Sequence, residues 1–409
     1  MLAHIWFGFF AVAFVSALYQ WLVNGHAAIF SEIMQSTFDM AALSVEVAIG
    51  LVGVLCLWLG FFRIAEKSGL IKVLARGLEP LFVRLMPEVP RGHASHGSIT
   101  MNVAANMLGL DNAATPMGLK AMQDLQQLNP EKDTASNAQI LFLVLNTSSV
   151  TLLPVTIFMY RAQQGAADPT AVFIPILMAT SASTLAGLAA VAWVQRINLF
   201  NRVVLGYFFA FAVLMALLAT LLLAQPAEQM ASTSGLLGNL ILFSIIMLFL
   251  AAGWQRRINV YDAFIEGAKQ GFDVAVRLIP FLVGMLVAIG VLRSSGVLDG
   301  LIVGIEFLLS GIGINTDFIQ ALPTALMKPL SGSGARAMML ETMNNFGVDS
   351  FPATVSAIMQ GSTETTFYVL AVYFGSVGIR RVRHALSCAL VADAAGILTS
   401  ILVGYWFFH

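Results

Sequence analysis

Long apolar stretches set the strongest constraint on this chain. A helix needs about 20 mostly apolar residues to cross the hydrocarbon core of a bilayer, and in lipid its backbone groups must be paired along the helix itself. Only 11% of the 409 residues are charged, whereas a soluble domain carries about 25% charged residues. We therefore predict an all-α polytopic membrane protein with about nine transmembrane helices. The predicted spans are residues 4–23, 40–62, 138–160, 171–195, 203–224, 236–253, 273–292, 355–377 and 385–407.

The basic residues predict how these spans are oriented. Cytoplasmic loops of membrane proteins carry an excess of Lys and Arg. With the N-terminus inside, 17 of the 21 Lys and Arg residues fall in inner segments or at the edge of a span beside them. The outer segments then keep only Arg161, Arg293, Lys328 and Arg336. We predict an inner N-terminus and an outer C-terminus, with the first span retained because no small-residue cleavage site follows it.

The sequence gives little support to other protein classes. A net charge of −1 supplies no basic field for nucleic acid, and Cys56 and Cys388 lie in apolar runs, as small core residues do. His93 and His96 have a spacing that suits a metal, but without a third ligand nearby a solvated pair is the favoured interpretation. We find no motif for a hydrolase, a dinucleotide or a nucleotide. The expectation is a protein that is not an enzyme and holds no cofactor or structural metal.

Two segments are too polar or glycine-rich to span, yet too apolar to be solvated loops. Residues 93–128 break at Leu110–Pro116, and residues 323–346 break at Pro329–Gly334. Small residues at such breaks let helix backbones approach one another closely. We interpret both segments as re-entrant hairpins, each of which enters and leaves the membrane on one face.

The order of elements repeats along the chain. Each copy reads span, span, hairpin, broken span, span, over about 4–195 and 236–407, and polar residues break the fourth element at 146–149 and 361–364. Each copy crosses the membrane four times, so the additional span at 203–224 inverts the second copy. This is an inverted-topology repeat, the plan of many secondary transporters, which bind solutes at mid-membrane between discontinuous helices.

The residues that carry the duplication also resemble a known family. Residues 106–122 (NMLGLDNAATPMGLKAM) resemble spore maturation protein A, whereas 329–334 (PLSGSG), 361–368 (GSTETTFY) and 371–375 (AVYFG) resemble spore maturation protein B. Both belong to the nucleoside-recognition or Gate group, which is similar to parts of concentrative nucleoside transporters and of the ferrous iron transporter B. The resemblance implies a fused protein in a bacterial cytoplasmic membrane. Its parts would be an A-like repeat at 1–200, an inverting linker helix at 201–234 and a B-like repeat at 235–409.

Ionisable residues inside predicted spans are the strongest functional candidates, because charge in a membrane is costly and is kept for a reason. Glu364 lies at the break of a span, where a carboxylate beside unwound carbonyls suits a Na⁺ ligand or a proton carrier. Asp393, inside the last span, is the second candidate for ion coupling. A structural role remains open for both, since either carboxyl group can be satisfied by neighbouring helix ends or basic residues.

Other polar residues surround the same predicted site. Half-helix N-termini favour anionic groups at mid-membrane, whereas C-terminal ends favour cations. Helix capping remains an equal alternative for Asp111 and Asn112, and close helix packing remains one for Asn146–Ser148. The candidates for solute binding are Asn106, Asp111, Asn112, Asn146, Thr147, Ser148, Ser331, Ser333, Arg336, Gln360, Ser362, Thr363, Glu364 and Tyr368.

The sequence thus favours a secondary transporter of a small polar solute, nucleoside-like or another metabolite, with Na⁺ or H⁺ as a candidate coupling ion. The expected partners are the solute and the lipid bilayer, with a homo-oligomer as an open question and no nucleic acid. Two alternatives stay open. One is a non-transporting receptor or scaffold that keeps the pocket, and the weaker one is a metal-ion permease, which the lack of Cys or Met at the breaks disfavours.

Overall fold

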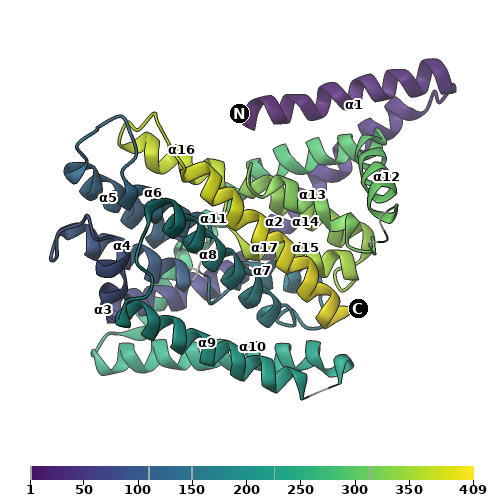
Figure 1. Cartoon of the computed structure of the whole chain (residues 1–409). Coiled ribbons are helices and arrows are strands. Elements are labelled where there is room, and N and C mark those ends of the chain that lie inside the picture. The colour runs from purple at the N-terminus through teal and green to yellow at the C-terminus, as the bar shows by residue number, and fades with distance from the viewer. Residues whose placement is uncertain (1, 109–110, 149–150, 225, 312, 314) are drawn as a thin grey trace.

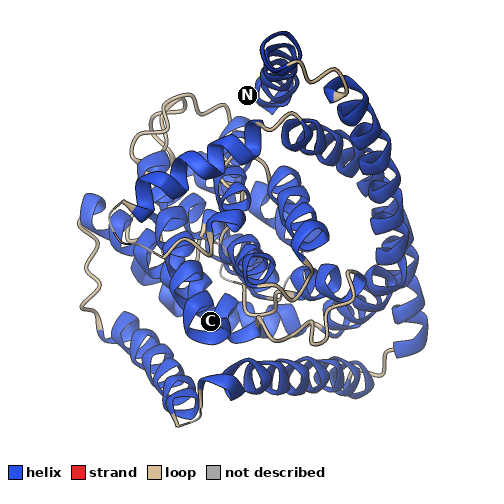
Figure 2. Ribbon diagram, turned by 90° about the vertical axis from the view of Figure 1, so that its right-hand side faces the viewer, coloured by secondary structure: helices blue, strands red, loops and turns tan. Residues whose placement is uncertain are grey.

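The computed structural model describes residues 2–108, 111–148, 151–224, 226–311, 313 and 315–409. Across these residues the chain is α-helical, and its backbone forms only an isolated bridge between Thr134 and Arg381 in place of a sheet (Figure 2). The helix α1 (Leu2–Asn24) lies at one edge of the molecule, and α9 (Arg202–Leu223) with α10 (Ala227–Gln255) lies at the opposite edge (Figure 1). The predicted all-α class is confirmed.

The remaining helices form two series with the same order. The first is α2 (Ile29–Ser68), α3 (Leu70–Leu85), α4 (Ala94–Met107), α5 (Asp111–Leu128), α6 (Asn137–Thr147), α7 (Val155–Gln163) and α8 (Phe173–Gln195). The second is α11 (Val260–Ser294), α12 (Val297–Ser310), the 3₁₀ turn η1 (Ile319–Ala321) with α13 (Leu322–Met327), α14 (Gly332–Phe346), α15 (Phe351–Ser362), α16 (Thr366–Ser376) and α17 (Ala385–Phe408).

The lengths of the helices fit a multi-pass membrane protein. Six helices in the described part of the chain are long and apolar enough to span: Trp6–Asn24, Ile29–Ser68, Phe173–Gln195, Gln229–Gln255, Val260–Ser294 and Ala385–Phe408. The other three predicted spans are the two broken ones, which form pairs of half-helices, and the apolar α9. The count of nine therefore stays a prediction, while the polytopic class is shown.

The same kind of turn follows the first helix of each series. The long helices α2 and α11 are followed by Gly69 (φ 77°) and Gly296 (φ 70°), after which α3 and α12 begin. A left-handed backbone is costly for residues that carry a Cβ atom, so glycine suits this sharp change of direction. The predicted boundary of the second span was too short, however. The 40 residues of α2 reach about 60 Å, because the helix continues through the polar segment before residue 40.

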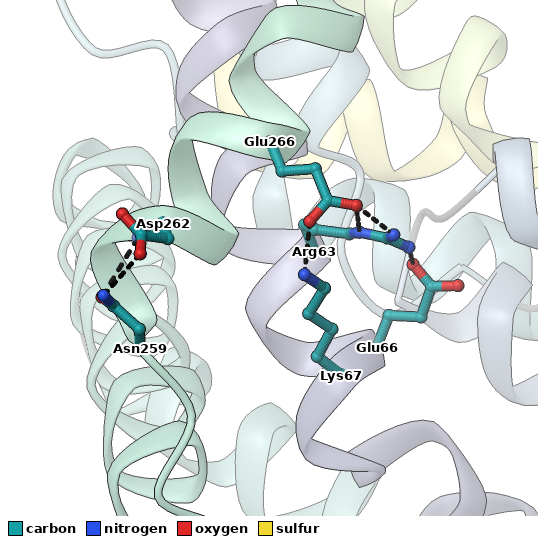
Figure 3. Close-up of polar contacts among 6 residues, drawn as sticks. All are labelled: Arg63, Glu66, Lys67, Asn259, Asp262 and Glu266. Atoms are coloured by element: carbon teal, nitrogen blue, oxygen red, sulfur yellow. Dashed lines mark hydrogen bonds and ion pairs between the residues drawn. The ribbon is translucent and has the colours of Figure 1, made fainter.

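The two long helices pack against each other in opposite directions. A Cβ atom at Gly290 would lie 3.6 Å from Cβ of Met40, whereas Gly271 lies against the backbone of Cys56. Residues with higher numbers on α2 therefore contact residues with lower numbers on α11, so the two helices run antiparallel. Where the C-terminal end of α2 meets the N-terminal part of α11, Glu266 pairs with both Arg63 and Lys67 (Figure 3).

The helices that close the two series also run antiparallel. A Cβ atom at Gly187 of α8 would lie 3.0 Å from Cβ of Ala392, and one at Gly396 of α17 would lie 3.2 Å from Cβ of Ser183. Two corresponding pairs of helices thus run in opposite directions, as an inverted repeat requires. The duplication predicted from the order of elements is present in the fold.

The predicted hairpins form helix pairs, with one correction. The break of the second hairpin separates α13 from α14, as expected. The first break was predicted at Leu110–Pro116, but α4 ends at Met107 and α5 begins at Asp111, with Pro116 inside it. Pro116 is the sixth residue of α5. A proline there removes one backbone hydrogen bond and crowds the carbonyl four residues earlier, which can kink a helix without ending it.

Candidate functional site

The two broken helices meet at their breaks. The first break separates α6 from α7, and the second separates α15 from α16. The backbone N–H of Glu364 donates to the carbonyl of Thr147 over 2.8 Å. This hydrogen bond joins the C-terminal end of α6 to the unwound segment after α15, so interrupted helices from both halves come together at one place.

Each hairpin is tied to the break of its own half by a matching backbone hydrogen bond. In the first half, the N–H of Leu152 donates to the carbonyl of Met107 over 3.0 Å, at the end of the first hairpin helix. In the second half, the N–H of Phe367 donates to the carbonyl of Pro329 over 3.0 Å. The repeat therefore extends to the backbone contacts that hold each hairpin tip beside its break.

A cavity of about 260 Å³ lies where the breaks and hairpins meet. Its lining comes from α4, α5, α6, α7, α14, α15 and α16, together with the segments that join the half-helices. The lining residues are Asn106, Ala114, Thr115, Asn146, Thr151, Leu153, Pro154, Thr156, Ile157, Lys328, Gly332, Arg336, Gln360, Gly361, Thr363, Glu364, Tyr368, Val369, Val372 and Tyr373.

Half of the predicted solute-binding residues line this cavity. They come from both halves of the chain and are Asn106, Asn146, Arg336, Gln360, Thr363, Glu364 and Tyr368. The exposed residues of the lining are Thr115, Glu364 and Tyr368, and the others are buried or half-buried, so these three side chains stand where the cavity opens. The structure therefore brings these predicted residues together, although their roles stay predictions.

Five predicted residues form local hydrogen bonds at the ends of the half-helices instead, four of them with the backbone. The hydroxyls of Thr147, Ser148 and Ser362 donate to carbonyls three residues earlier. Ser331 caps α14 by accepting from the N–H of Gly334 over 3.1 Å, and Ser333 contacts the Ser331 hydroxyl. These side chains terminate or begin the half-helices. Asp111 and Asn112 begin α5, but their side chains lie outside the described part of the structure.

A hydrogen-bond network crosses the cavity wall between the two halves. Asn146 Oδ1 accepts from Asn106 Nδ2 at 3.0 Å and from the Tyr373 hydroxyl at 3.3 Å. Asn146 Nδ2 donates to the carbonyl of Phe142, which fixes the orientation of the amide. Sequence reasoning missed Tyr373 as a site residue. Its place in the AVYFG segment at 371–375 was the available signal.

Charged groups lie on the second-half side of the cavity. Lys328 and Arg336 flank the break of the second hairpin, and the guanidinium carbon of Arg336 stands 5.4 Å from the ring centroid of Tyr160. Glu364 is the carboxylate in the lining. Asp393 lies behind the wall, where it is buried and accepts from the Thr366 hydroxyl over 2.7 Å.

Two buried polar atoms in the lining have no hydrogen-bond partner among the described residues. Gln360 Oε1 and Thr363 Oγ1 belong to side chains that are 6% and 1% exposed. A buried polar atom without a partner costs about 1–3 kcal/mol. A solute, ion or water in the cavity would supply the missing hydrogen bonds.

The histidine pair near the first hairpin does not have the predicted environment. His93 caps α4 by accepting from the N–H of Ser95 over 3.2 Å. His96 is buried, so the two histidines are not a solvated pair. Among the described residues, no group of three or more His, Cys, Asp or Glu side chains is placed to hold a metal ion.

Comparison with known proteins places this fold in a family. The family described as Gate, nucleoside recognition, matches residues 48–163 and 275–380, one segment in each half. Spore maturation protein B of Bacillus subtilis (strain 168) is 43% identical over 159 residues, which are 39% of this chain and 88% of that protein. Spore maturation protein A of the same organism is 38% identical over 149 residues, which are 36% of this chain and 76% of that protein. The chain therefore belongs to the Gate family of nucleoside-recognition proteins, as a multi-pass membrane member.

Proposed function

We propose that this protein is a secondary transporter that binds a small polar solute, nucleoside-like or another metabolite, in the cavity between the breaks. The observation that carries the proposal is that both hairpins and both broken helices contribute to one cavity at the meeting of two inverted halves. Transporters built from inverted repeats bind their solutes at such a junction and expose it to each side of the membrane in turn. The family's description as nucleoside recognition agrees with this substrate class.

The size and polarity of the cavity support a metabolite-sized solute. Small-molecule sites usually enclose about 300–1,000 Å³, and this cavity is slightly smaller. Its amide and hydroxyl groups, Asn106, Gln360 and Thr363 among them, suit the hydroxyl and amide groups of a polar metabolite. Val369 and Val372 supply an apolar patch on α16 against which a ring or carbon chain can pack.

Glu364 is our candidate for ion coupling. Its carboxylate stands at the mouth of the cavity, beside the junction where its own N–H meets the carbonyl of Thr147. A carboxylate near the ends of interrupted helices can hold Na⁺, or can take up a proton, as the solute binds. Asp393 lies one layer behind, so we assign it to tuning the charge of the site. We propose no enzymatic activity and no resident cofactor.

The placement in the cell follows from the charge pattern. We propose a bacterial cytoplasmic membrane, with the N-terminus inside and the C-terminus outside, because 17 of the 21 Lys and Arg residues then fall in inner segments or at the edge of a span beside them. We also propose that the halves correspond to the two B. subtilis relatives, the A-like repeat at 1–200 and the B-like repeat at 235–409, joined by the inverting segment 201–234. The two separate stretches matched by the Gate family support this division.

The test combines binding with transport. Purified protein is screened for thermal stabilisation by nucleosides, amino acids and small hydroxy acids, and each ligand found is then followed into proteoliposomes with and without Na⁺ and pH gradients. Binding together with gradient-driven uptake supports the proposal. Binding without flux under every gradient would instead favour the receptor alternative, and no binding across the panel would contradict both.

A matched pair of variants separates the cavity from the fold. Gln360→Leu removes a lining acceptor that has no described partner, so we expect weaker solute binding with the stability of the free protein unchanged or slightly increased. Gln164→Leu is the control, since its amide contacts only the neighbouring Gln163 side chain among the described residues and lies outside the cavity lining. Equal binding by the two variants would remove the cavity as the site.

A further inference from the structure

A second pocket, of about 520 Å³, lies outside the solute cavity, where α8 ends and the chain turns toward α9. Its lining comes from the end of α3 and the turn after it, from the start of α6, and from the segment 195–201. Arg84, Arg91 and Arg196 line it, and Glu88 is the one acidic residue in the described lining. We call it the arginine pocket, and its walls carry a net positive charge.

The three arginines are available to a ligand. Their side chains are exposed, and no ion pair or side-chain hydrogen bond joins any of them to another residue in the described part of the chain. Glu88 has a different partner, because its carboxylate accepts from the amide of Asn137. A guanidinium group presents five N–H donors in a planar fork that fits a phosphate group. The arginine pocket therefore suits a phosphate-bearing ligand.

A third pocket, of about 230 Å³, adjoins the arginine pocket, since Leu85 lines both. It lies among α3, α4, α6, α8 and α9, where α3 and α9 pack against each other (Figure 1). Phe208 and Phe211 of α9 line one side, and the hydroxyl of Tyr207 donates to the carbonyl of Gly77. The lining is almost wholly apolar. This apolar pocket therefore suits a hydrocarbon chain.

The surroundings place both pockets at the boundary between membrane and water. The helix α3 buries four apolar residues on one face and exposes Lys72, Arg76 and Arg84 on the other. Amphipathic helices of this kind lie in the plane of the membrane interface. Trp193, three residues before Arg196, is 86% exposed, and tryptophan is enriched at the level of the lipid headgroups. The arginine pocket thus lies where headgroups are found.

We propose that the two adjoining pockets together bind one phospholipid with an anionic headgroup. Its phosphate lies among Arg84, Arg91 and Arg196, and one acyl chain lies in the apolar pocket. The charge of the arginine pocket favours an anionic headgroup, and its continuity with the apolar pocket through Leu85 favours a lipid over a free anion. Basic pockets between transmembrane helices on the cytoplasmic side bind such headgroups. This lipid site is separate from the proposed solute cavity.

The acyl chain packs behind the first hairpin. Met107 and Leu152 line the apolar pocket, and the backbone hydrogen bond between them ties the first hairpin to the first break. Thr151 lines both the apolar pocket and the solute cavity. A ligand that binds the folded state and not the unfolded chain stabilises the fold. The bound lipid therefore stabilises the protein, and it does so at one wall of the solute cavity.

The test compares lipids that share their chains and differ in headgroup charge. Full-length protein, freed of native lipid in a neutral detergent, is mixed with dioleoyl phosphatidylglycerol or dioleoyl phosphatidylcholine. Native mass spectrometry counts the bound lipids, and thermal unfolding reports their effect on stability. Three arginines against Glu88 leave two positive charges in the lining, so we expect phosphatidylglycerol to bind at least tenfold tighter than phosphatidylcholine. Inorganic phosphate and glycerophosphoglycerol, which lack the chains, should not stabilise the protein at the same concentrations.

A matched pair of variants assigns the preference to the arginine pocket. Arg196 and Arg257 both have φ 54°, a left-handed backbone that glycine adopts without strain. Both arginines lie on the side that we propose faces the cytoplasm, but Arg257 is outside the lining. Arg196→Gly should weaken the binding of phosphatidylglycerol roughly fivefold, whereas Arg257→Gly should leave it unchanged. Arg84→Gln is the second pocket variant, so that a folding defect in one does not remove the test.

Each outcome decides for or against the lipid site. Preference for phosphatidylglycerol that falls in the pocket variants and persists in Arg257→Gly supports it. Equal binding of the two lipids would overturn it, and so would a preference that survives both pocket variants or falls equally in Arg257→Gly. Stabilisation by inorganic phosphate that matches that of the lipid would mean a site for a free anion. None of these results depends on the solute, so the proposed function is tested separately.

Discussion

The contact between the two long helices yields a sharp prediction about Gly271. Gly267 and Gly271 are spaced four apart on α11 and face the backbone of α2. Small residues at this spacing let membrane helices pack at close range. A Cβ atom at Gly271 would lie 2.5 Å from the backbone N of Cys56 and 2.6 Å from its Cα. Backbone atoms cannot rotate away, so Gly271→Ala must push the helices apart.

The size of the effect follows from two opposing terms. Replacing glycine by alanine inside a helix gains about 1 kcal/mol from helix propensity, whereas overpacking a close contact costs about 1–3 kcal/mol. Gly284 on the same helix is the matched control, because a Cβ atom there meets nothing within 4 Å. Both variants gain the propensity term, so their difference isolates the packing term, about 1–3 kcal/mol.

The assay is thermal unfolding of the purified protein in detergent. At about 2 °C per kcal/mol, the scale for larger domains, Gly271→Ala should melt roughly 2–6 °C below Gly284→Ala. Two variants that melt at the same temperature would refute the close approach of the helices at this point, and with it the register of the α2–α11 contact.

Three further predictions concern charged and titrating groups. Glu364→Gln should keep the melting temperature of the wild type but abolish the dependence of uptake on the Na⁺ or pH gradient; uptake with unchanged ion dependence would make Glu364 structural. Asp349→Ala removes the 2.9 Å ion pair of buried Arg161 and should lower the free energy of unfolding by about 1–3 kcal/mol. The loss stays in this range because Asp349 is half-exposed and Arg161 keeps other acceptors. An unchanged melting temperature would contradict this. Burial, with a smaller effect of nearby positive charge, holds the pKa of His384 below its ordinary 6.5, and the ring accepts from Gln195 Nε2 at 3.0 Å. As the pH falls below 6.5 the unfolded chain takes up the proton first, so the folded state loses stability. Between pH 8 and pH 5 the melting temperature should therefore fall less for His384→Gln than for the wild type. Parallel melting curves would refute the assignment of a lowered pKa to His384.

The general plan of the fold was predictable because it depends on the alternation of long apolar segments with short polar ones along the chain. Uninterrupted apolar runs predict helices that span, and the polar breaks at residues 146–149 and 361–364 stand out against them. The inversion followed from counting crossings between the copies. Since corresponding helices run antiparallel in the structure, this counting argument was sound.

Local boundaries were less predictable, because they depend on contacts that composition does not record. Pro116 suggested a break, yet it lies within α5. The predicted span began at residue 40, yet α2 begins at Ile29 and continues through the polar residues before the span, since its partner α11 covers one of its faces. An uninterrupted apolar run indicates which portion of such a helix faces lipid, but it does not indicate where the helix begins and ends.

Within the site, the polar residues at the breaks divided according to their hydrogen bonds. Thr147, Ser148 and Ser362 satisfy nearby carbonyls, whereas Gln360 and Thr363 leave atoms available in the cavity. The residue types are alike in the sequence, and only the direction of each side chain separates them. That direction is set by the unwinding of the two breaks, which small residues permit but do not specify.

The most direct test of the central claim asks whether the halves run in opposite directions. In a background with Cys56 and Cys388 replaced by serine, the pairs Met40→Cys/Gly290→Cys and Gly60→Cys/Phe264→Cys place cysteines at contacts between α2 and α11. The first pair has a Cβ–Cβ distance of 3.6 Å, within the range of about 3.5–4.5 Å for a disulfide. The swapped pairs 40 with 264 and 60 with 290 are the controls. We predict rapid oxidative cross-linking of the first two pairs and none of the swapped pairs; cross-linking of the swapped pairs instead would mean that the halves run in the same direction, and would contradict this account of the cavity.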